Sequence, residues 1–327
     1  MIAVFAIAIA LALGACGSKN NTSSSNASPG TGSNVPKTIG ISFPGATQEG
    51  AVQDEMKYCQ QEATRLGYKV VINDPGQDQQ AQLNTIQTWG AAHFPVILAQ
   101  VLDPGPFGNV IAPLQKSGTK WITYGVSLPG ENGYIDMNQN QGGTEIGKLA
   151  GAWIKKNVTG TAQVALLTYE PAAWARAREV GIMQGLNESG AKYQVVAKQD
   201  ALSQSDGLAA MTPMIQAHPH INVVLACEET ATEGAYQAFV NAGYPKNDPK
   251  VFLGGIDGTL EALTLLHQGN TMYRGSAAIN LKDLGVAMAD TAVKLAQGAN
   301  NLTYKVQYTP LTPGDPATTS FLAAWGK

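Results

Sequence analysis

Short apolar and β-branched runs alternate with longer amphipathic segments along almost the whole chain from residue 38. The first runs are TIGISF, YKVVIN, PVILAQ and KWITYG, and the segments between them are expected to form helices near 50–66, 79–90 and 106–117. A parallel pair of strands needs a long crossover connection, which is usually a helix. The alternation therefore predicts an α/β fold with parallel sheets covered by helices.

The second half of the chain repeats the plan of the first. Its expected strands are AQVALLTY, YQVVAK, NVVLAC and VFLGGID, and its expected helices span 142–157, 174–188, 205–217 and 231–242. The stretch that starts at Tyr68 aligns with the one that starts at Tyr193, and the Ala-His pairs that end in His93 and His218 keep the same offset of 125 residues. Matching apolar positions can arise from a shared period alone, but the shared Tyr-x-Val-Val and Ala-His favour two similar domains. A length of 327 residues suits two domains of ordinary size.

Composition and charge narrow the classes of partner. Hydrophobic residues make up 44% of the chain and charged residues 14%, which is typical of a soluble globular protein. The formal net charge is −3 and the pI is near 5.8, so the chain lacks the basic surface that binds phosphate backbones. We therefore expect no nucleic-acid partner and favour a small neutral ligand.

The N-terminus has the pattern of a bacterial lipoprotein leader over residues 1–16. The apolar run in MIAVFAIAIALALGACGS has roughly 15 residues, shorter than the ~20 that cross a bilayer, and it ends in small residues. Leu13-Gly14-Ala15-Cys16 resembles a lipobox, in which the lipid is attached to Cys16. No Lys or Arg precedes the run, a departure that an initiator upstream of Met1 would explain. The alternative is a buried helix with an incidental cysteine.

Residues 17–36 are rich in Ser, Asn, Gly and Thr, so they cannot bury enough apolar surface to fold and are expected to form a flexible tether. Anchor and tether would place the folded part outside the cell membrane, in the cell envelope. An oxidising compartment permits a disulfide. However, Cys59 falls in an expected helix and Cys227 at a strand end in the other half, so we expect two buried free thiols.

Several stretches carry a specific resemblance. They are EATRLGYKVVI, LAGAWIKK, AREVG, IQAHPHINVVLA and GGIDGTLEAL. By their order and spacing, residues 38 to about 310 resemble the periplasmic sugar-binding proteins of the ribose and galactose type, which serve ABC importers. The resemblance implies two Rossmann-like domains with parallel sheets joined by a three-crossing hinge, the type I periplasmic binding protein fold. It implies an N-terminal domain of 37–140 plus 280–306, a C-terminal domain of 141–279 plus 307–327, a monomer, and no cofactor.

The resemblance also implies a ligand site between the domains, where strands end. The family's pocket arginine corresponds to Arg178, its pocket aspartate to Asp257, and the polar residue after a second-domain strand to Glu228. Further candidates are Gln48 and Glu49 in the first-domain loop, Asn280 at the second crossing, and Tyr124, Asn138 and Trp174. The chain departs from many relatives in three places. Tyr124-Gly125-Val126 stands where they carry an Asp-Arg pair, Asn138-Gln139-Asn140-Gln141-Gly142-Gly143 stands where they carry an Asp-Asn before a glycine, and Glu228 stands where asparagine is usual. These departures leave the identity of the sugar open.

The residue types suit hydroxyl-bearing ligands, which need carboxylate acceptors, Arg or Asn donors and an aromatic face. Asp257 could instead cap the helix expected near 259. Arg178 opposes the dipole of its expected helix, so it needs a partner, which could be a ligand, a cleft carboxylate or a surface acid. Trp174 could stack on a sugar or pack under that helix.

The acidic pair Glu228-Glu229 precedes the sequence TATE. That sequence matches a capping box with Thr230 at the N-cap and Glu233 three residues later. We therefore expect Glu228, more than Glu229, to be left for ligand contact.

Other functions have weaker support. The chain has no G-x-S-x-G elbow, no P-loop and no H-E-x-x-H, and its four histidines are scattered, so we expect neither an enzyme nor a metal site. The sequence predicts an extracytoplasmic solute-binding lipoprotein that delivers a monosaccharide, sugar alcohol or similar polyhydroxy ligand to an ABC permease. The alternatives are a nucleoside or small-signal binding protein that feeds a permease or sensor, and a secreted carbohydrate-active enzyme.

Overall fold

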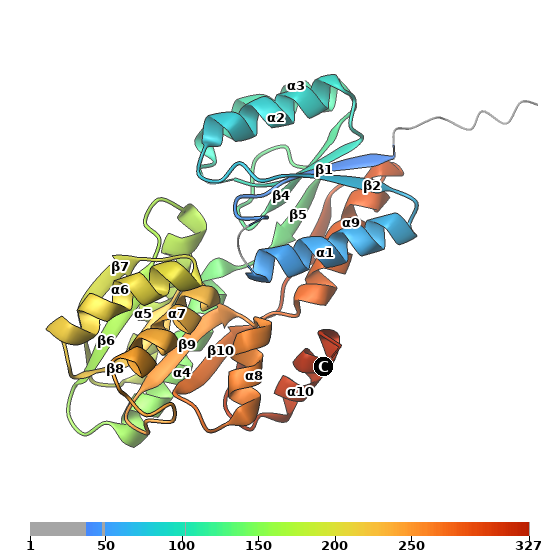
Figure 1. Ribbon diagram of the computed structural model, residues 1–327. Helices are drawn as coiled ribbons and strands as arrows, with labels where there is room; N and C mark the ends of the chain where they lie inside the picture. Colours follow the sequence, from blue (N-terminus) through green and yellow to red (C-terminus); the bar gives the residue numbers. More distant parts are fainter. Residues whose placement is uncertain (1–36, 48–49, 102, 327) are drawn as a thin grey trace, which may run out of the picture. The chain divides into compact units, whose positions relative to one another are not determined.

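The computed structural model describes residues 37–47, 50–101 and 103–326 (Figure 1). The expected signal peptide (1–16) with Cys16, the expected tether (17–36), and the candidates Gln48 and Glu49 lie outside the described residues. Within the described part of the chain, no helix is long and apolar enough to cross a membrane.

The first sheet contains six strands in the order β11-β5-β4-β3-β1-β2, and every neighbouring pair is parallel. Its strands are β1 (Thr38–Ser42), β2 (Lys69–Asn73), β3 (Val96–Gln100), β4 (Lys120–Tyr124), β5 (Gly133–Asp136) and β11 (Leu302–Lys305). The helices that pack on it are α1 (Gly50–Arg65), α2 (Gln79–Ala91), the short 3₁₀ helix η1 (Gly105–Phe107), α3 (Gly108–Lys116) and α9 (Leu281–Ala296).

The second sheet also contains six strands, in the order β12-β10-β9-β8-β6-β7. Only the short edge strand β12 is antiparallel to its neighbour. Its strands are β6 (Ala162–Thr168), β7 (Tyr193–Asp200), β8 (Ile221–Ala226), β9 (Phe252–Asp257), β10 (Tyr273–Ala278) and β12 (Thr309–Leu311). The accompanying helices are α4 (Gln139–Asn157), α5 (Ala173–Ser189), α6 (Gln204–Ala217), α7 (Glu229–Asn241), α8 (Leu260–Gln268) and α10 (Pro316–Ala324).

Helices cover both faces of each sheet, which explains the unbroken apolar runs of the strands. All five residues of β3 are buried. Val96 and Leu98 belong to the apolar cluster on the side of α1 and α9, whereas Ile97 and Ala99 belong to the cluster under α2 and α3. Successive residues of a strand point to opposite faces, so a central strand that is covered twice has no polar side. In Figure 1, α2 and α3 lie on one side of the first sheet and α1 and α9 on the other.

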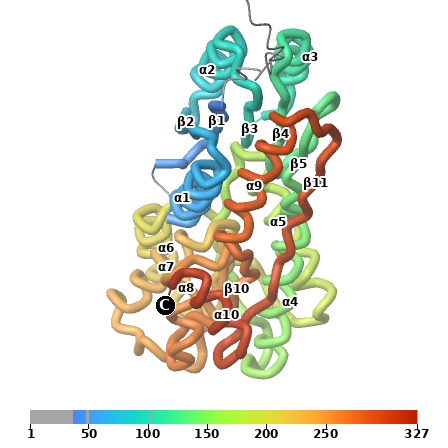
Figure 2. The backbone as a smooth tube through the Cα atoms, turned by 90° about the vertical axis from the view of Figure 1, so that its right-hand side faces the viewer, coloured from blue at the N-terminus to red at the C-terminus, as the bar shows by residue number. Residues whose placement is uncertain are grey.

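The chain passes between the two sheets three times. It leaves the first sheet after β5 and enters α4, it returns after β10 into α9, and it crosses again between β11 and β12. In Figure 2 the red C-terminal segment runs from β11, beside β5, to α10. The crossings lie at 137–138, 279–280 and 306–308. The predicted fold class is confirmed, including the hinge of three crossings.

The sequence repeat corresponds to repeated structure. Helices α2 and α6 begin at Gln79 and Gln204, and strands β3 and β8 begin at Val96 and Ile221, each pair 125 residues apart. The prediction for the cysteines that the structure describes is also confirmed, because both thiols are free and buried.

Candidate functional site

A pocket of about 50 Å³ lies where the carboxyl ends of strands from both sheets meet. Its polar and aromatic lining includes Phe43, Glu55, Gln100, Tyr124, Gln139, Tyr169, Trp174, Arg178, Glu228 and Asp257. Of the residues expected to bind a ligand, the structure brings together Tyr124, Trp174, Arg178, Glu228 and Asp257.

The centre of the pocket is an ion pair between Arg178 on α5 and Asp257 at the end of β9. Nη2 of Arg178 donates to Oδ1 of Asp257 at 2.8 Å and Nη1 donates to Oδ2 at 3.0 Å, so the pair is bidentate. Both side chains are buried, at 4% and 7% exposure. Nη1 also donates to the carbonyl oxygen of Cys227 at 2.7 Å, and Nε donates to Oε1 of Gln139 at 2.6 Å. The arginine that opposes its helix dipole is thus compensated by a carboxylate and two further acceptors.

Close packing of α4 against α5 holds Arg178 in place. A Cβ added at Gly143 of α4 would lie 2.0 Å from the carbonyl oxygen of Arg178, and one added at Gly181 of α5 would lie 2.1 Å from the carbonyl oxygen of Asn140. Only glycine permits such an approach of two backbones. The same approach brings Gln139, the first residue of α4, within reach of the guanidinium.

A buried glutamate braces the turn that carries Asp257. The backbone of Asp257 has φ of 134°, a region that non-glycine residues rarely adopt, and Gly258 follows at 83°. Oε2 of Glu229 accepts hydrogen bonds from the backbone N–H of Gly258 and of Thr259, both at 2.6 Å, and Oε1 accepts one from the hydroxyl of Tyr273 at 2.8 Å. Surrounding structure that fixes the turn in this way allows a strained residue to persist at the site.

The expected capping box of Thr230 and Glu233 is wrong. Helix α7 begins two residues earlier than expected, at Glu229, and its N-cap Glu228 makes no side-chain capping bond. The hydroxyl of Thr230 instead donates to the carbonyl oxygen of Leu202 at 2.7 Å, and Glu233 accepts from the hydroxyl of Thr259 at 2.5 Å. Both side chains are buried against other segments, so tertiary partners replace the local pattern.

Glu228 adds a second carboxylate to the pocket. It is 5% exposed, and its Oε2 lies 3.8 Å from Nη1 of Arg178.

Thr259 rather than Asp257 caps α8, through a hydrogen bond from the N–H of Ala262 to the Thr259 hydroxyl. The capping alternative for Asp257 is therefore ruled out.

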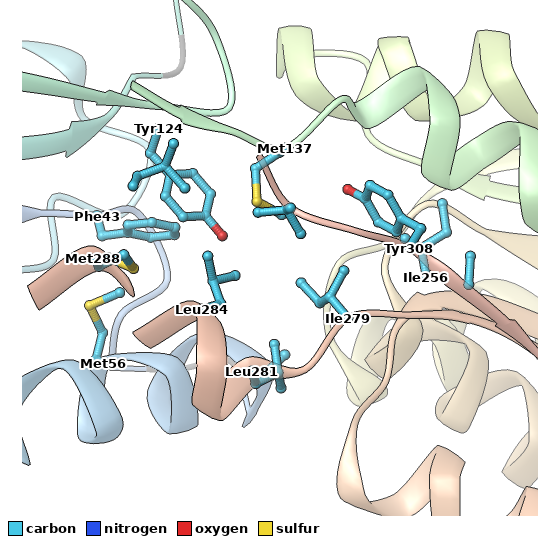
Figure 3. Packing of buried hydrophobic residues seen from close by; sticks show 14 of the residues in the cluster. Phe43, Met56, Tyr124, Met137, Ile256, Ile279, Leu281, Leu284, Met288 and Tyr308 are labelled. Atoms are coloured by element: carbon cyan, nitrogen blue, oxygen red, sulfur yellow. The ribbon is translucent and has the colours of Figure 1, made fainter. Parts of the chain in front are cut away.

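Aromatic rings enclose the charged centre. The guanidinium of Arg178 lies over the ring of Trp174, with its Cζ 5.2 Å from the ring centroid. On the first-sheet side, Tyr124 packs edge-on against Phe43 with a centroid separation of 4.8 Å. Figure 3 shows these two rings near Met137, and Tyr308 on the side of the second sheet. The stacking role of Trp174 stays a prediction.

Two further candidates that the structure describes, Asn138 and Asn280, do not line the pocket. Asn138 and Asn280 are the N-caps of α4 and α9, and each side chain accepts from a backbone N–H three residues later. Arg176, two residues before Arg178 on α5, is exposed and donates to the carbonyl oxygen of Glu170. Asn is favoured at the N-cap because its side-chain oxygen accepts a hydrogen bond from a free backbone N–H of the first turn, which accounts for both positions.

The pocket residues that were not predicted include Glu55 on α1, Gln139 on α4, Phe43 and Gln100. Tyr308 was not predicted either; it does not line the pocket itself, but its hydroxyl donates to Oε1 of Gln139 at 3.3 Å. The sequence carries a signal for Glu55, because it interrupts the apolar stripe of Ala51, Cys59 and Ala63 at a spacing of four. No local signal distinguishes Gln139 or Tyr308.

Burial changes the acidity of the pocket groups. Burial raises the pKa of Glu55 to about 8, and the hydrogen bond from Tyr124 offsets only part of this effect. It raises the pKa of Tyr308 to about 12 and that of Tyr124 well above its usual value. Burial alone would lower the pKa of Arg178, but the carboxylates of Asp257 and Glu228 hold it well above its ordinary value. The arginine is thus a permanent cation.

The pocket offers carboxylate acceptors, a fixed guanidinium donor and aromatic rings. Carboxylate oxygens have further lone pairs beyond those that Arg178 uses, so they can still accept bonds from hydroxyl groups. Among the described residues, no group of three or more His, Cys, Asp and Glu side chains is placed to hold a metal ion.

Comparison with known proteins agrees with this architecture. A model of the periplasmic binding protein domain matches residues 39–300. The ribose import binding protein RbsB of Escherichia coli is 26% identical over 243 residues, which cover 73% of this chain and 78% of that protein.

Two solved structures share the fold. An ABC transporter solute-binding protein from Bacillus halodurans with bound myo-inositol superposes with a TM-score of 0.78 at 19% identity, covering 90% of this chain and 100% of that one. A protein from Mycobacterium smegmatis in complex with β-D-fucofuranose has a TM-score of 0.77 at 18% identity, covering 88% and 97%. The resemblance found in the sequence is confirmed. The chain belongs to the periplasmic binding protein domain family, a family of solute-binding proteins.

Proposed function

We propose that this protein is an extracytoplasmic solute-binding lipoprotein that captures a monosaccharide, a sugar alcohol or a similar polyhydroxy compound and delivers it to an ABC importer. The observation that carries the proposal is the buried pair of Arg178 and Asp257 with Glu228 beside it, enclosed by Trp174 and Tyr124. Its carboxylates accept from hydroxyl groups, its guanidinium donates, and its rings cover C–H surface. The ribose, myo-inositol and β-D-fucofuranose bound or carried by the relatives are all polyhydroxy compounds.

Capture would involve movement at the three crossings. The pocket volume of about 50 Å³ is far below the 300–1,000 Å³ typical of small-molecule sites. A ligand of monosaccharide size would therefore enter when the two sheets separate at 137–138, 279–280 and 306–308. Closure around the ligand would present a defined surface to the permease. The lipid on Cys16, the monomeric state and the lack of catalysis belong to the same proposal.

Thermal unfolding with added compounds tests the function. The purified protein is heated with D-ribose, myo-inositol, D-fucose or adenosine, each at 1 mM. A compound present at a hundredfold excess over its Kd stabilises the folded state by about 2.7 kcal/mol. A rise in Tm with one of the first three supports the proposal. A rise with adenosine alone would favour the nucleoside alternative, and conversion of a compound to a new product would favour an enzyme. No rise with any of them would overturn the proposal.

A further inference from the structure

Glu55 is a buried acid on the first-sheet side of the pocket. It lies in the second turn of α1, 2% exposed, on the stripe that packs into the core. Its Oε2 accepts a hydrogen bond from the hydroxyl of Tyr124 at 3.1 Å. Its Oε1 is buried as well and has no hydrogen-bond partner among the described residues. Glu55 lines the same pocket as Arg178 and Asp257.

An unsatisfied buried oxygen is costly to a fold. Buried polar side-chain atoms almost always have a partner, and one without a partner costs free energy that an apolar residue of similar size would avoid. Leucine would pack on the stripe formed by Ala51, Cys59 and Ala63 without that cost. The hydrogen bond from Tyr124 involves only Oε2, so Oε1 contributes nothing to the stability of the fold.

The surroundings of Glu55 favour the neutral carboxylic acid. The titratable and charged groups that face it are Tyr124 after β4, Cys59 on α1, Arg178 on α5, Asp257 at the end of β9 and Glu228 before α7. The pKa of Glu55 is raised to about 8, mainly by burial and to a smaller extent by the charge of Asp257, while the hydrogen bond from Tyr124 and the charge of Arg178 act in the opposite direction. Because Oε2 already accepts from Tyr124, the proton resides on Oε1 and is available for donation.

We propose that Glu55 is a ligand-contact residue that recognises a polyhydroxy ligand by donating a hydrogen bond from Oε1 to one of the ligand's hydroxyl oxygens. This inference rests on the function proposed above. The ligand would then be held by Arg178, Asp257 and Glu228 from the second sheet and by Glu55 from the first. Glu55 would thereby select a ligand with an oxygen at that position and would link binding to closure of the two sheets.

Calorimetric titration with D-ribose, myo-inositol and D-fucose at pH 7 tests the contact. E55L removes both oxygens at similar size, and E55Q keeps one acceptor and one donor. We expect E55L to bind the tightest of the three compounds roughly 10- to 100-fold more weakly than wild type. E55Q should stay within about threefold of wild type, since its amide N–H donates while its carbonyl oxygen accepts from Tyr124. The matched control E62Q, on the same helix but paired with Arg65, should bind like wild type.

The pH dependence separates a contact from a merely structural role. The donor is present below a pKa of about 8 and is lost as pH rises through that value. Affinity of the wild type should therefore fall roughly tenfold between pH 7 and pH 9, because the protonated fraction of Glu55 falls by about that factor. E55Q cannot titrate and should show a flat profile. Glu233 also has a pKa of about 8 but does not line the pocket. If its titration caused the pH dependence of binding, that dependence would persist in E55Q.

Each outcome is decisive. Weakened E55L together with a flat E55Q profile supports the proposal. E55L that binds as tightly as wild type, or E55Q that keeps the full pH dependence, overturns the role of Glu55 while the proposed function stands. If E55L does not fold, the pH profile of E55Q decides alone. Wild type that binds none of the three compounds overturns the proposed function and this inference with it.

Discussion

The substitution Asp257→Asn should destabilise the protein strongly, because it leaves the buried Arg178 without its bidentate partner. The amide keeps the shape of the carboxylate and removes its charge. Arg178 is 4% exposed and would retain Gln139 and the carbonyl oxygen of Cys227 as neutral acceptors. Only Glu228, with an oxygen 3.8 Å from Nη1, would remain as a counter-charge.

The magnitude follows from the geometry. Two unit charges about 4 Å apart attract by roughly 4 kcal/mol at an effective dielectric constant near 20. The oxygen of the new amide still accepts one hydrogen bond from the guanidinium, which recovers about 1 kcal/mol. The expected loss is therefore about 3 kcal/mol, at the lower end of the ~3 to 5 kcal/mol found when one partner of a buried pair is removed.

Urea unfolding followed by tryptophan fluorescence and by far-ultraviolet circular dichroism measures this loss, and coincident curves justify a two-state fit. Asp290→Asn, on α9 and outside the pocket, is the control and should change stability by less than about 0.5 kcal/mol. Replacing both partners, with Arg178→Met and Asp257→Leu, should give a more stable protein than Arg178→Met alone, because Arg178→Met leaves the buried carboxylates of Asp257 and Glu228 without their cation and the double change removes one of them. A loss below about 1 kcal/mol for Asp257→Asn, or a double variant less stable than Arg178→Met alone, would refute the reasoning.

Three further outcomes follow from the packing. Gly143→Ala should cost about 2 kcal/mol or more in urea unfolding, because its Cβ would lie 2.0 Å from a carbonyl oxygen of α5; Gly108→Ala, whose Cβ would meet nothing within 4 Å, should cost nothing, and equal losses would contradict the close packing. Glu229→Ala leaves three hydrogen-bond donors around the turn after β9 without an acceptor. We therefore expect the free energy of unfolding to fall by about 2 to 4 kcal/mol and myo-inositol to bind more weakly than to the wild type; unchanged binding would disprove the bracing role. Cys59 and Cys227 are buried, which raises the pKa of both thiols, so Ellman's reagent should label them only in guanidinium chloride; rapid labelling of the native protein would contradict their burial.

Sequence patterns predicted the elements well because the information is local. A run such as PVILAQ has to be a strand with both faces covered, and the offset that relates Tyr68 to Tyr193 reflects a repeated unit. The rule that parallel sheets bind ligands at the carboxyl ends of their strands then placed Asp257 and Glu228 near a pocket. The resemblance to the ribose and galactose type predicted Arg178 as a site residue. The local sequence indicated only that its charge is unfavourable near the N-terminus of its helix.

The predictions that differ from the structure concern polar residues that could either cap a helix or form hydrogen bonds with a distant segment or the pocket. Thr230 and Glu233 match a capping box, yet their side chains form hydrogen bonds with residues that lie 28 and 26 positions away in the chain. Asn138 and Asn280 were expected in the pocket but cap helices instead. A local motif indicates which hydrogen bonds a side chain can form. Which of them forms depends on the distant segments that pack against that side chain.

The sequence by itself determined the α/β alternation, the duplicated plan and the strand ends that carry acids, because hydrophobic period and turn chemistry act over a few residues. Only the tertiary structure decided which polar groups share the pocket. Gln139 and Tyr308 are 169 residues apart, and Tyr124 and Glu55 are 69 apart, yet each pair is joined by a hydrogen bond. The physical reason is that a buried polar atom must find a partner wherever the packed chain supplies one, and sequence distance does not limit that choice.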